Sequence, residues 1–262
     1  MITLIYCLII LIACSVGAII GIGGGIIIKP VLDLIGYHSV ETVGFISSCA
    51  VFSMSISSSV SHIVSKTKFD KKIVIYISLG SVLGGIAGNA ILSQAFARLN
   101  ENTVKGIQGI MIAAIIIFVV IYVNLKNAVS FKLKSPVIIV ITAFILGMIS
   151  TFLNIGGGLL NIACLTLLFS FTVKESAVYS VAVIFFSQLS RLVMVFISNQ
   201  FEPFREYFPI IAAVICTAII SGIIGSKLNK KLSASAVNAV FSVVLSSVAL
   251  INIFNAVTGF TF

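Results

Sequence analysis

Charged residues are scarce in this sequence. Asp, Glu, Lys and Arg make up only 9% of its 262 residues, while apolar residues make up 60% and the mean hydropathy is +1.25. Soluble domains carry about 25% charged residues, so we expect a lipid bilayer to be the solvent of this chain. Apolar runs of about the ~20 residues that span a bilayer lie at 73–97, 106–123, 136–153, 207–225 and 236–257. The alternating polarity of a β-barrel is lacking, which predicts an all-α polytopic membrane protein.

Residues that carry chemistry are also few. The sequence has seven acids, two histidines and five scattered cysteines, with no CxxC pair, no metal-ligand spacing and no Walker A motif. A membrane enzyme needs a nucleophile with its base or a metal cluster, so we expect no enzymatic activity, no cofactor and no metal. No acid falls mid-span in a long predicted helix, which disfavours a cation- or proton-driven pump because such pumps usually hold a buried carboxylate.

The positive charge is unevenly placed. The net charge is +9, and most of the basic residues are lysines in three short loops, 66–72, 126–134 and 227–231. This distribution is typical of the positive-inside rule. We therefore place the three loops in the cytoplasm and expect no nucleic-acid partner.

The chain contains two copies of one pattern. GIGGG (21–25) is repeated as NIGGG (154–158), and each is followed by a Glu near the start of the next helix, Glu41 and Glu175. A Gly-containing stretch and a final apolar helix follow in each copy, at an offset of 133 to 137 residues. Such order predicts two structural repeats. Their boundaries are 1–125 for the first transmembrane repeat, 126–135 for a cytoplasmic linker and 136–262 for the second transmembrane repeat.

Each repeat is expected to hold five helical segments. They run over 3–20, 25–36, 40–64, 73–96 and 104–124, and over 136–153, 158–171, 175–198, 207–227 and 235–257. The segment after each triglycine would be only ~20 Å long, too short for the ~30 Å hydrocarbon core, so we expect it to begin part-way through the membrane. The lysine loops then require an odd number of net crossings per repeat. This makes the repeats inverted and places both termini outside.

The triglycines are the first candidate for a binding site. A helix that begins inside the membrane exposes free N–H groups and the positive end of its dipole, and glycines let an anion come close to these donors. Two such helix starts, facing each other, would form an anion cradle. Close helix packing is the alternative role for these glycines. The candidate residues are Gly23, Gly24, Gly25, Asn154, Gly156, Gly157 and Gly158.

Arg191 is the second candidate. It lies inside predicted helix 175–198, where a charge costs about 2.5–3.5 kcal/mol even on the insertion scale and usually marks a site. We expect it to be a counter-charge or a bidentate ligand of the anion, and a structural Arg bonded to carbonyls is the alternative. Gln188 lies within one turn of Arg191. Ser57 belongs to the hydroxyl-rich run of the matching helix, and both side chains are candidate donors to an oxyanion.

Several motifs resemble those of a known family. GIGGGIIIKP (21–30), ETVGFISS (41–48), SHIVSKTKFD (61–70), the second NIGGG and GIIGSKL (222–228) are similar to the TauE/SafE family of sulfite-exporter-like membrane proteins. The resemblance covers essentially the whole chain. It implies transport of small sulfur-containing anions such as sulfite and organosulfonates. Asn154 departs from the family pattern, which usually has Gly at this position.

The predicted function is therefore a secondary transporter or permease for a small sulfur-containing oxyanion in the cytoplasmic membrane, working by alternating access of two inverted repeats. Its expected partners are the anion and the lipid bilayer, and homo-oligomerisation is left open. Two alternatives are a membrane partner subunit without transport, and a transporter of another small anion or of a cation. The short loops disfavour the former, and the missing mid-span carboxylates disfavour a cation.

Overall fold

The computed structural model describes residues 2–65, 69–124, 131–133, 135–198 and 202–261. Within these residues the chain is helical and has no strand. The elements are α1 (Ile2–Ile20), α2 (Gly25–Ile35), α3 (Val40–Val64), α4 (Lys71–Arg98), α5 (Glu101–Asn124), α6 (Pro136–Leu153), α7 (Gly158–Phe169), α8 (Val173–Ile197), the 3₁₀-helix η1 (Glu202–Tyr207), α9 (Phe208–Lys231) and α10 (Ala234–Thr261). Seven helical stretches of this described part are long and apolar enough to cross a membrane. The predicted all-α polytopic fold is confirmed.

The two helices that follow the triglycines are short. α2 has 11 residues and α7 has 12, or about 17–18 Å at 1.5 Å per residue, against a hydrocarbon core of ~30 Å. Each ends in a left-handed residue, Gly36 with φ 65° and Ser170 with φ 59°, whose N–H closes the last turn. Neither helix can cross the core alone, in agreement with the prediction that both begin part-way through it.

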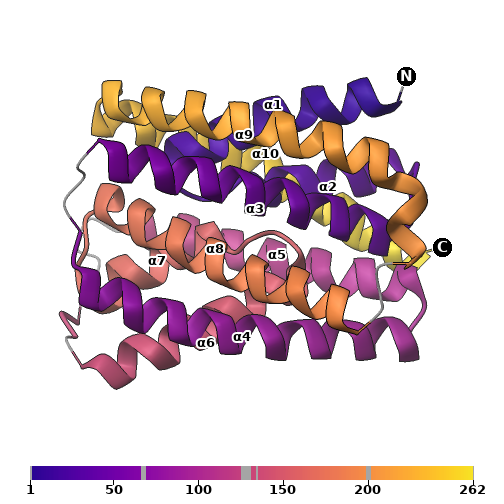
Figure 1. Ribbon diagram of the computed structural model, residues 1–262, viewed down its shortest axis with the longest axis horizontal. Coiled ribbons are helices and arrows are strands. Elements are labelled where there is room, and N and C mark those ends of the chain that lie inside the picture. Colours follow the sequence, from indigo (N-terminus) through magenta and orange to yellow (C-terminus); the bar gives the residue numbers. More distant parts are fainter. Residues whose placement is uncertain (1, 66–68, 125–130, 134, 199–201, 262) are drawn as a thin grey trace.

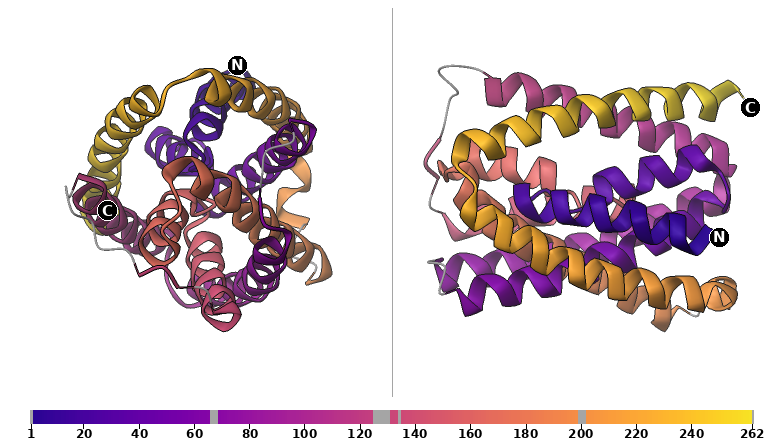
Figure 2. Two further views of the ribbon diagram at one scale, coloured as in Figure 1. Left: turned by 90° about the vertical axis from the view of Figure 1, so that its left-hand side faces the viewer. Right: turned by 90° about the horizontal axis from the view of Figure 1, so that it is seen from above.

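The two halves of the chain are interleaved in space (Figure 1, Figure 2). α4 packs along α6 and α8, α9 packs along α1 and α3, and α5 pairs with α10. The apolar core follows this arrangement. One cluster joins α1, α2 and α3 mainly with α9, and another joins α4 with α6, α7 and α8. Each helix bundle therefore mixes elements from both predicted repeats.

Matched helices run in opposite directions through the molecule (Figure 1). α3 begins at the end where the N and C labels lie and runs away from it, whereas α8 runs towards that end, and α4 and α9 are opposed in the same way. The start of α4, with Lys72, and the end of α9, with Lys231, lie at the other end. These courses are the ones that inverted repeats require. The inversion itself and the orientation in the cell membrane stay predictions.

The boundary between the predicted repeats is only partly visible. Most of the predicted linker 126–135 lies outside the described residues. Phe131 and Leu133 donate backbone hydrogen bonds to the carbonyls of Leu167 and Leu168, at 2.9 and 2.8 Å. This part of the linker is therefore joined to the end of α7.

Candidate functional site

The two helix interruptions contain backbone that side chains rarely adopt. We call residues 21–24, between α1 and α2, the first break, and residues 154–157, between α6 and α7, the second break. Left-handed backbone is expensive for L-residues other than glycine and, occasionally, Asn. The positive φ angles are 78° at Gly21 and 73° at Gly23 in the first break, and 58° at Asn154, 73° at Gly156 and 63° at Gly157 in the second. Both GGG motifs therefore interrupt helices, as predicted.

Both breaks lie close to the middle of the long central helices. A Cβ atom at Gly23 or at Gly156 would lie against the side chains of Val51 of α3 and Ile184 of α8. Val51 and Ile184 are each the twelfth residue of a 25-residue helix. The breaks are thus at mid-depth of α3 and α8, in agreement with the prediction that α2 and α7 begin part-way through the membrane.

Each break also contacts the first residue of the helix that follows the other break, and the two contacts are reciprocal. A Cβ atom at Gly25 would meet the carbonyl oxygen of Ile155, and one at Gly158 would meet the carbonyl oxygen of Ile22. Gly25 and Gly158 are 133 positions apart, and so are Ile22 and Ile155. Two contacts related in this way are the pattern of a two-fold interface. The helix starts face each other as expected, but in this conformation the backbones leave no room for an anion directly between them.

Glycines outside the breaks are packed in the same way. A Cβ atom at Gly84 would meet the Phe144 carbonyl of α6, and one at Gly222 would meet the Ser57 hydroxyl of α3. A Cβ atom at Gly24 would likewise lie 2.9 Å from Cα of Cys14. Close packing therefore accounts for part of the glycine pattern at the breaks as well as elsewhere.

Arg191 joins α8 to α3 beside the second break. Its guanidinium donates to the carbonyl of Gly44 at 3.2 Å and to the hydroxyl of Ser48, and the residue is 4% exposed. Its Nε has no hydrogen-bond partner among the described residues. Arg191 lies six residues, or about 9 Å, before α8 ends at Ile197, so it is about halfway between mid-depth and the end that carries the chain termini.

Asn154 lies against the same stretch of α3. A Cβ atom at Gly44 would meet its amide nitrogen, and its backbone carbonyl accepts a hydrogen bond from the Ser47 hydroxyl at 3.1 Å. The Asn154 side chain is buried, and neither its amide nitrogen nor its amide oxygen has a partner in the described part of the chain. The fold therefore brings Asn154 and Arg191 together around Gly44.

Gln188 belongs to the same face of α8. Ile184, Gln188 and Arg191 follow the spacing i, i+4, i+7, which places them on one side of a helix, and Ile184 contacts both breaks. Gln188 is 0% exposed, and among the described residues both of its amide atoms lack a partner. Buried polar atoms without partners are rare and call for an explanation such as a bound ion or water.

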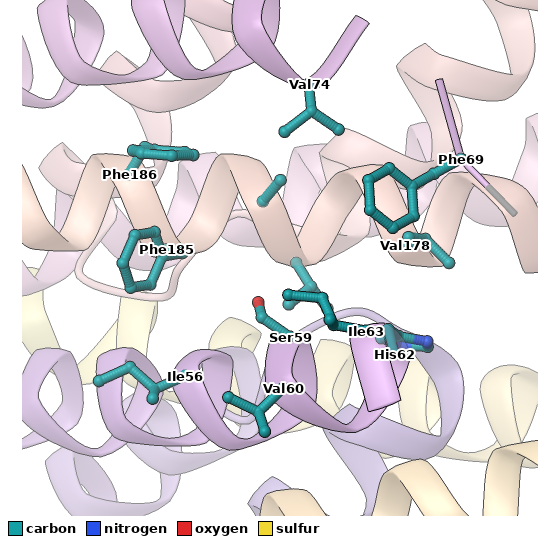
Figure 3. Close-up of a pocket in the computed structure, with 12 residues that line it drawn as sticks. Ile56, Ser59, Val60, His62, Ile63, Phe69, Val74, Val178, Phe185 and Phe186 are labelled. Carbon is teal, nitrogen blue, oxygen red and sulfur yellow. The ribbon is translucent and has the colours of Figure 1, made fainter. Parts of the chain in front are cut away.

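Two cavities flank this region between α3, α4 and α8. A small cavity of about 20 Å³ contains Arg191 together with Glu41, Asn89 and Phe204. A larger one of about 370 Å³ lies towards the other end, and Figure 3 shows its apolar walls, with Phe185 facing the side chains of α3 and Phe186 on the side of Val74 of α4. The cavity on the Arg191 side is therefore small, and the cavity towards the lysine-bearing ends is large.

Ser57 is not part of this cluster. Its hydroxyl donates to the Met54 carbonyl of its own helix at 2.9 Å and packs against Gly222 of α9. It lines a separate groove of about 490 Å³ that also contains Lys227 and Lys231. Of the residues predicted from the sequence, the breaks, Arg191 and Gln188 are brought together, and Ser57 is not.

Three residues of the cluster were not singled out from the sequence. Gly44, Ser47 and Ser48 of ETVGFISS (41–48) supply the surface of α3 that contacts Arg191 and Asn154. The spacing of Gly44 and Ser48, i and i+4, places both on one helix face. Only the packing of α3 against α8 shows that this face meets Arg191.

The comparison with known families settles the relationship of the chain. The model of the family "Sulfite exporter TauE/SafE" matches residues 6–251. The chain belongs to the TauE/SafE sulfite exporter family. A TauE/SafE relative from Bacillus subtilis (strain 168), named "Probable membrane transporter protein YunE", is 26% identical over 260 residues, covering 90% of this chain and 91% of the relative. No solved structure matches the chain. The family and the apolar helices together make this an integral membrane protein of a transporter family.

Proposed function

We propose that this TauE/SafE member is a secondary transporter of a small sulfur-containing oxyanion, sulfite or an organosulfonate, across the cytoplasmic membrane. The observation that carries the proposal is the cluster of buried polar groups beside the second break. Within the described residues, Arg191, Gln188 and Asn154 all have hydrogen-bonding atoms there that no partner uses. A desolvated cation with two amide side chains suits an oxyanion, since charge-assisted hydrogen bonds to Arg are among the strongest in proteins.

The proposed site is the face of α8 between the mid-depth breaks and Arg191. The free N–H groups at the starts of α2 and α7 add positive potential on one side of it, and the Arg191 guanidinium adds a full charge on the other. The anion is not held between Gly25 and Gly158 in this conformation, because the opposite carbonyls fill that space. Gly23 and Gly156 are the triglycine positions at which a Cβ atom would lie against Ile184 of α8, one turn before Gln188.

Two unequal cavities support alternating access as the mechanism of this transport. The wide cavity near the lysine-bearing ends and the narrow one at Arg191 correspond to a conformation open to the cytoplasm and closed to the outside, if the termini are external. If the two inverted halves exchanged conformations, the cavity at Arg191 would open and the larger cavity would close. This cycle requires no separate carrier protein, no ATP site and no soluble domain.

The experiment is anion exchange in proteoliposomes. Vesicles loaded with unlabelled sulfite or ethanesulfonate are mixed with the same labelled anion outside, and protein-free vesicles give the passive rate. We expect protein-dependent exchange of at least one of the two anions, with competition by the other. Exchange of chloride or phosphate alone would assign another small anion, sodium flux alone would assign a cation, and no flux at all would favour a non-transporting partner subunit.

A further inference from the structure

A buried ion pair lies in α2, just beyond the first break. Lys29 Nζ and Asp33 Oδ2 are 2.6 Å apart, and their side chains are 1% and 6% exposed. α2 begins at mid-depth with Gly25, so Lys29 and Asp33 lie at most about 6 and 12 Å along it, inside the ~15 Å half-thickness of the hydrocarbon core. The absence of acids from the middle of the predicted helices holds only for the long ones. The buried carboxylate is present, but in a short one.

The carboxylate is only half satisfied. Its Oδ1 has no hydrogen-bond partner in the described part of the chain, and the Asp33 backbone carbonyl accepts from Lys105 Nζ of α5 at 3.1 Å. Asp33 lies close enough to Tyr6 of α1 to act on it electrostatically. The Tyr6 hydroxyl is in turn hydrogen-bonded to His38 Nδ1 at 2.7 Å. The titratable or charged groups around the pair are Tyr6 on α1, Tyr37 and His38 before α3, Lys105 on α5 and, beside His38, Glu206 on η1.

Stability alone does not call for this pair. Burying two charges costs several kcal/mol per ion before they attract each other, and replacing a buried pair by apolar side chains is often neutral or stabilising. Ionisable residues inside a membrane protein are by default candidates for substrate or proton pathways. The pair therefore points to a function.

We propose that Lys29 and Asp33 form a proton-binding site that couples proton movement to anion movement, an inference that rests on the proposed transport function. Protonation of the Asp33 carboxylate leaves the Lys29 ammonium without its counter-ion. The added positive charge lies one turn from the start of α2 and attracts an anion to the breaks. By linkage, a bound anion raises the proton affinity of Asp33 by the same factor.

This coupling balances charge. One proton and one monoanion enter the site together and leave together, after which the Lys29–Asp33 pair forms again. Protons reach Asp33 from the end where the chain termini lie, past Tyr6 and His38. Burial lowers the pKa of His38 below its ordinary value of 6.5, against the opposing effect of Glu206.

The test compares two transport modes of the same protein. Proteoliposomes are assayed for exchange without a gradient, and for accumulation driven by an imposed pH gradient, using whichever of sulfite and ethanesulfonate the wild type exchanges. Asp33→Asn mimics the protonated acid, so we expect it to keep exchange but to lose gradient-driven accumulation by about tenfold or more. Glu202→Gln, which removes an exposed carboxylate, is the matched control and should accumulate like the wild type.

A second variant covers the case in which Asp33→Asn does not fold. Lys29→Met combined with Asp33→Leu removes both charges, so it should fold and show no response to the pH gradient. Gradient-driven accumulation by either folded variant at the wild-type level, or a wild type that exchanges the anion without any effect of the gradient, would overturn the inference. No exchange of either anion by the wild type would instead contradict the proposed function, and the coupling role with it.

Discussion

At the scale of single residues, Arg191 has more hydrogen-bonding capacity than the protein uses. It bonds the Gly44 carbonyl and the Ser48 hydroxyl of α3, and its Nε is unused within the described residues. The structural alternative from the sequence, an Arg bonded to carbonyls, is thus partly realised. The two roles are compatible, because Arg presents five donors.

Arg191→Leu separates the two roles. We expect anion exchange to fall at least tenfold while the yield of monodisperse protein changes little, because a charge-assisted hydrogen bond contributes about 1.5–3 kcal/mol and 1.4 kcal/mol is a factor of ten. Ser48→Ala is the control, since it removes one partner of the guanidinium and leaves the charge in place. Unchanged exchange in Arg191→Leu would exclude Arg191 from the site.

Glycine substitutions report on the contact between the breaks. Alanine at Gly158 would meet the Ile22 carbonyl, which belongs to the opposite break, whereas alanine at Gly36 would meet nothing within 4 Å and has only its positive φ as a penalty. We expect Gly36→Ala to cost about 1–2 kcal/mol and Gly158→Ala to lower the melting temperature clearly more. Circular dichroism melts in detergent give the comparison, and equal melting temperatures would argue against the close crossing of the breaks.

The same contacts decide which glycine variants can probe binding. Valine at Gly24 or Gly157 would meet Cys14 or Ser150, so both variants are expected to unfold whether or not an anion binds there. The sequence suggests these substitutions as probes of the anion site. Their neighbours show that such variants cannot distinguish a binding role from a packing role.

At the scale of helices, the distinctive feature is the exchange of partners between the two halves. α9 of the second half packs on α1 and α3 of the first, and the hydroxyls of Ser58 and Ser226 lie 2.8 Å apart across the α3–α9 contact. An independent folding of residues 1–125 and 136–262 would not produce this contact. It is therefore a direct marker of the interleaved packing.

A disulfide tests the α3–α9 contact. In a cysteine-free background, Ser58→Cys with Ser226→Cys should cross-link under mild oxidation, because the hydroxyls they replace are already within hydrogen-bond distance. With a protease site inserted in the linker, the two halves should run as one band until they are reduced. Ser58→Cys with Ser247→Cys on the exposed side of α10 is the control pair. Halves that separate without reduction would contradict the packing.

At the scale of the whole molecule, one end carries both chain termini and the other carries lysines. Lys72 at the start of α4 and Lys231 at the end of α9 lie at the end opposite to the N and C labels. The positive-inside rule then predicts that both termini are external. The proposed direction of opening and the proposed route of the proton both depend on this orientation.

Labelling from intact cells tests the orientation. In the cysteine-free background, single cysteines at the N-terminus and after Phe262 should react with a membrane-impermeant maleimide, and one at Lys72 should react only after permeabilisation. Residues 1 and 262 lie outside the described residues, so the test does not depend on their structure. Labelling of Lys72→Cys in intact cells, with protected termini, would reverse the topology.

The sequence by itself determined the elements of this protein. Low charge and long apolar runs determine a helical membrane fold. The bilayer core offers no hydrogen-bond partners, so only helices or closed barrels satisfy the backbone polar groups there. Glycine and Asn at the breaks stop helices through their local backbone preferences, so no helix end differs from its predicted position by more than four residues. The lysine loops and the duplicated triglycine are likewise local patterns.

Only the tertiary structure decided which elements meet. Hydrophobic burial has no direction, so an apolar helix does not specify in its own sequence that α4 joins α6 and α8. The contact of Arg191 with Gly44 and Ser48 follows from that packing and spans more than 140 positions. Lys29 and Asp33 are paired by their i, i+4 spacing on one helix, which is a local feature. Their burial inside the bilayer depends on α1, α3 and α10 packing around α2, which the spacing of two residues on one helix does not specify.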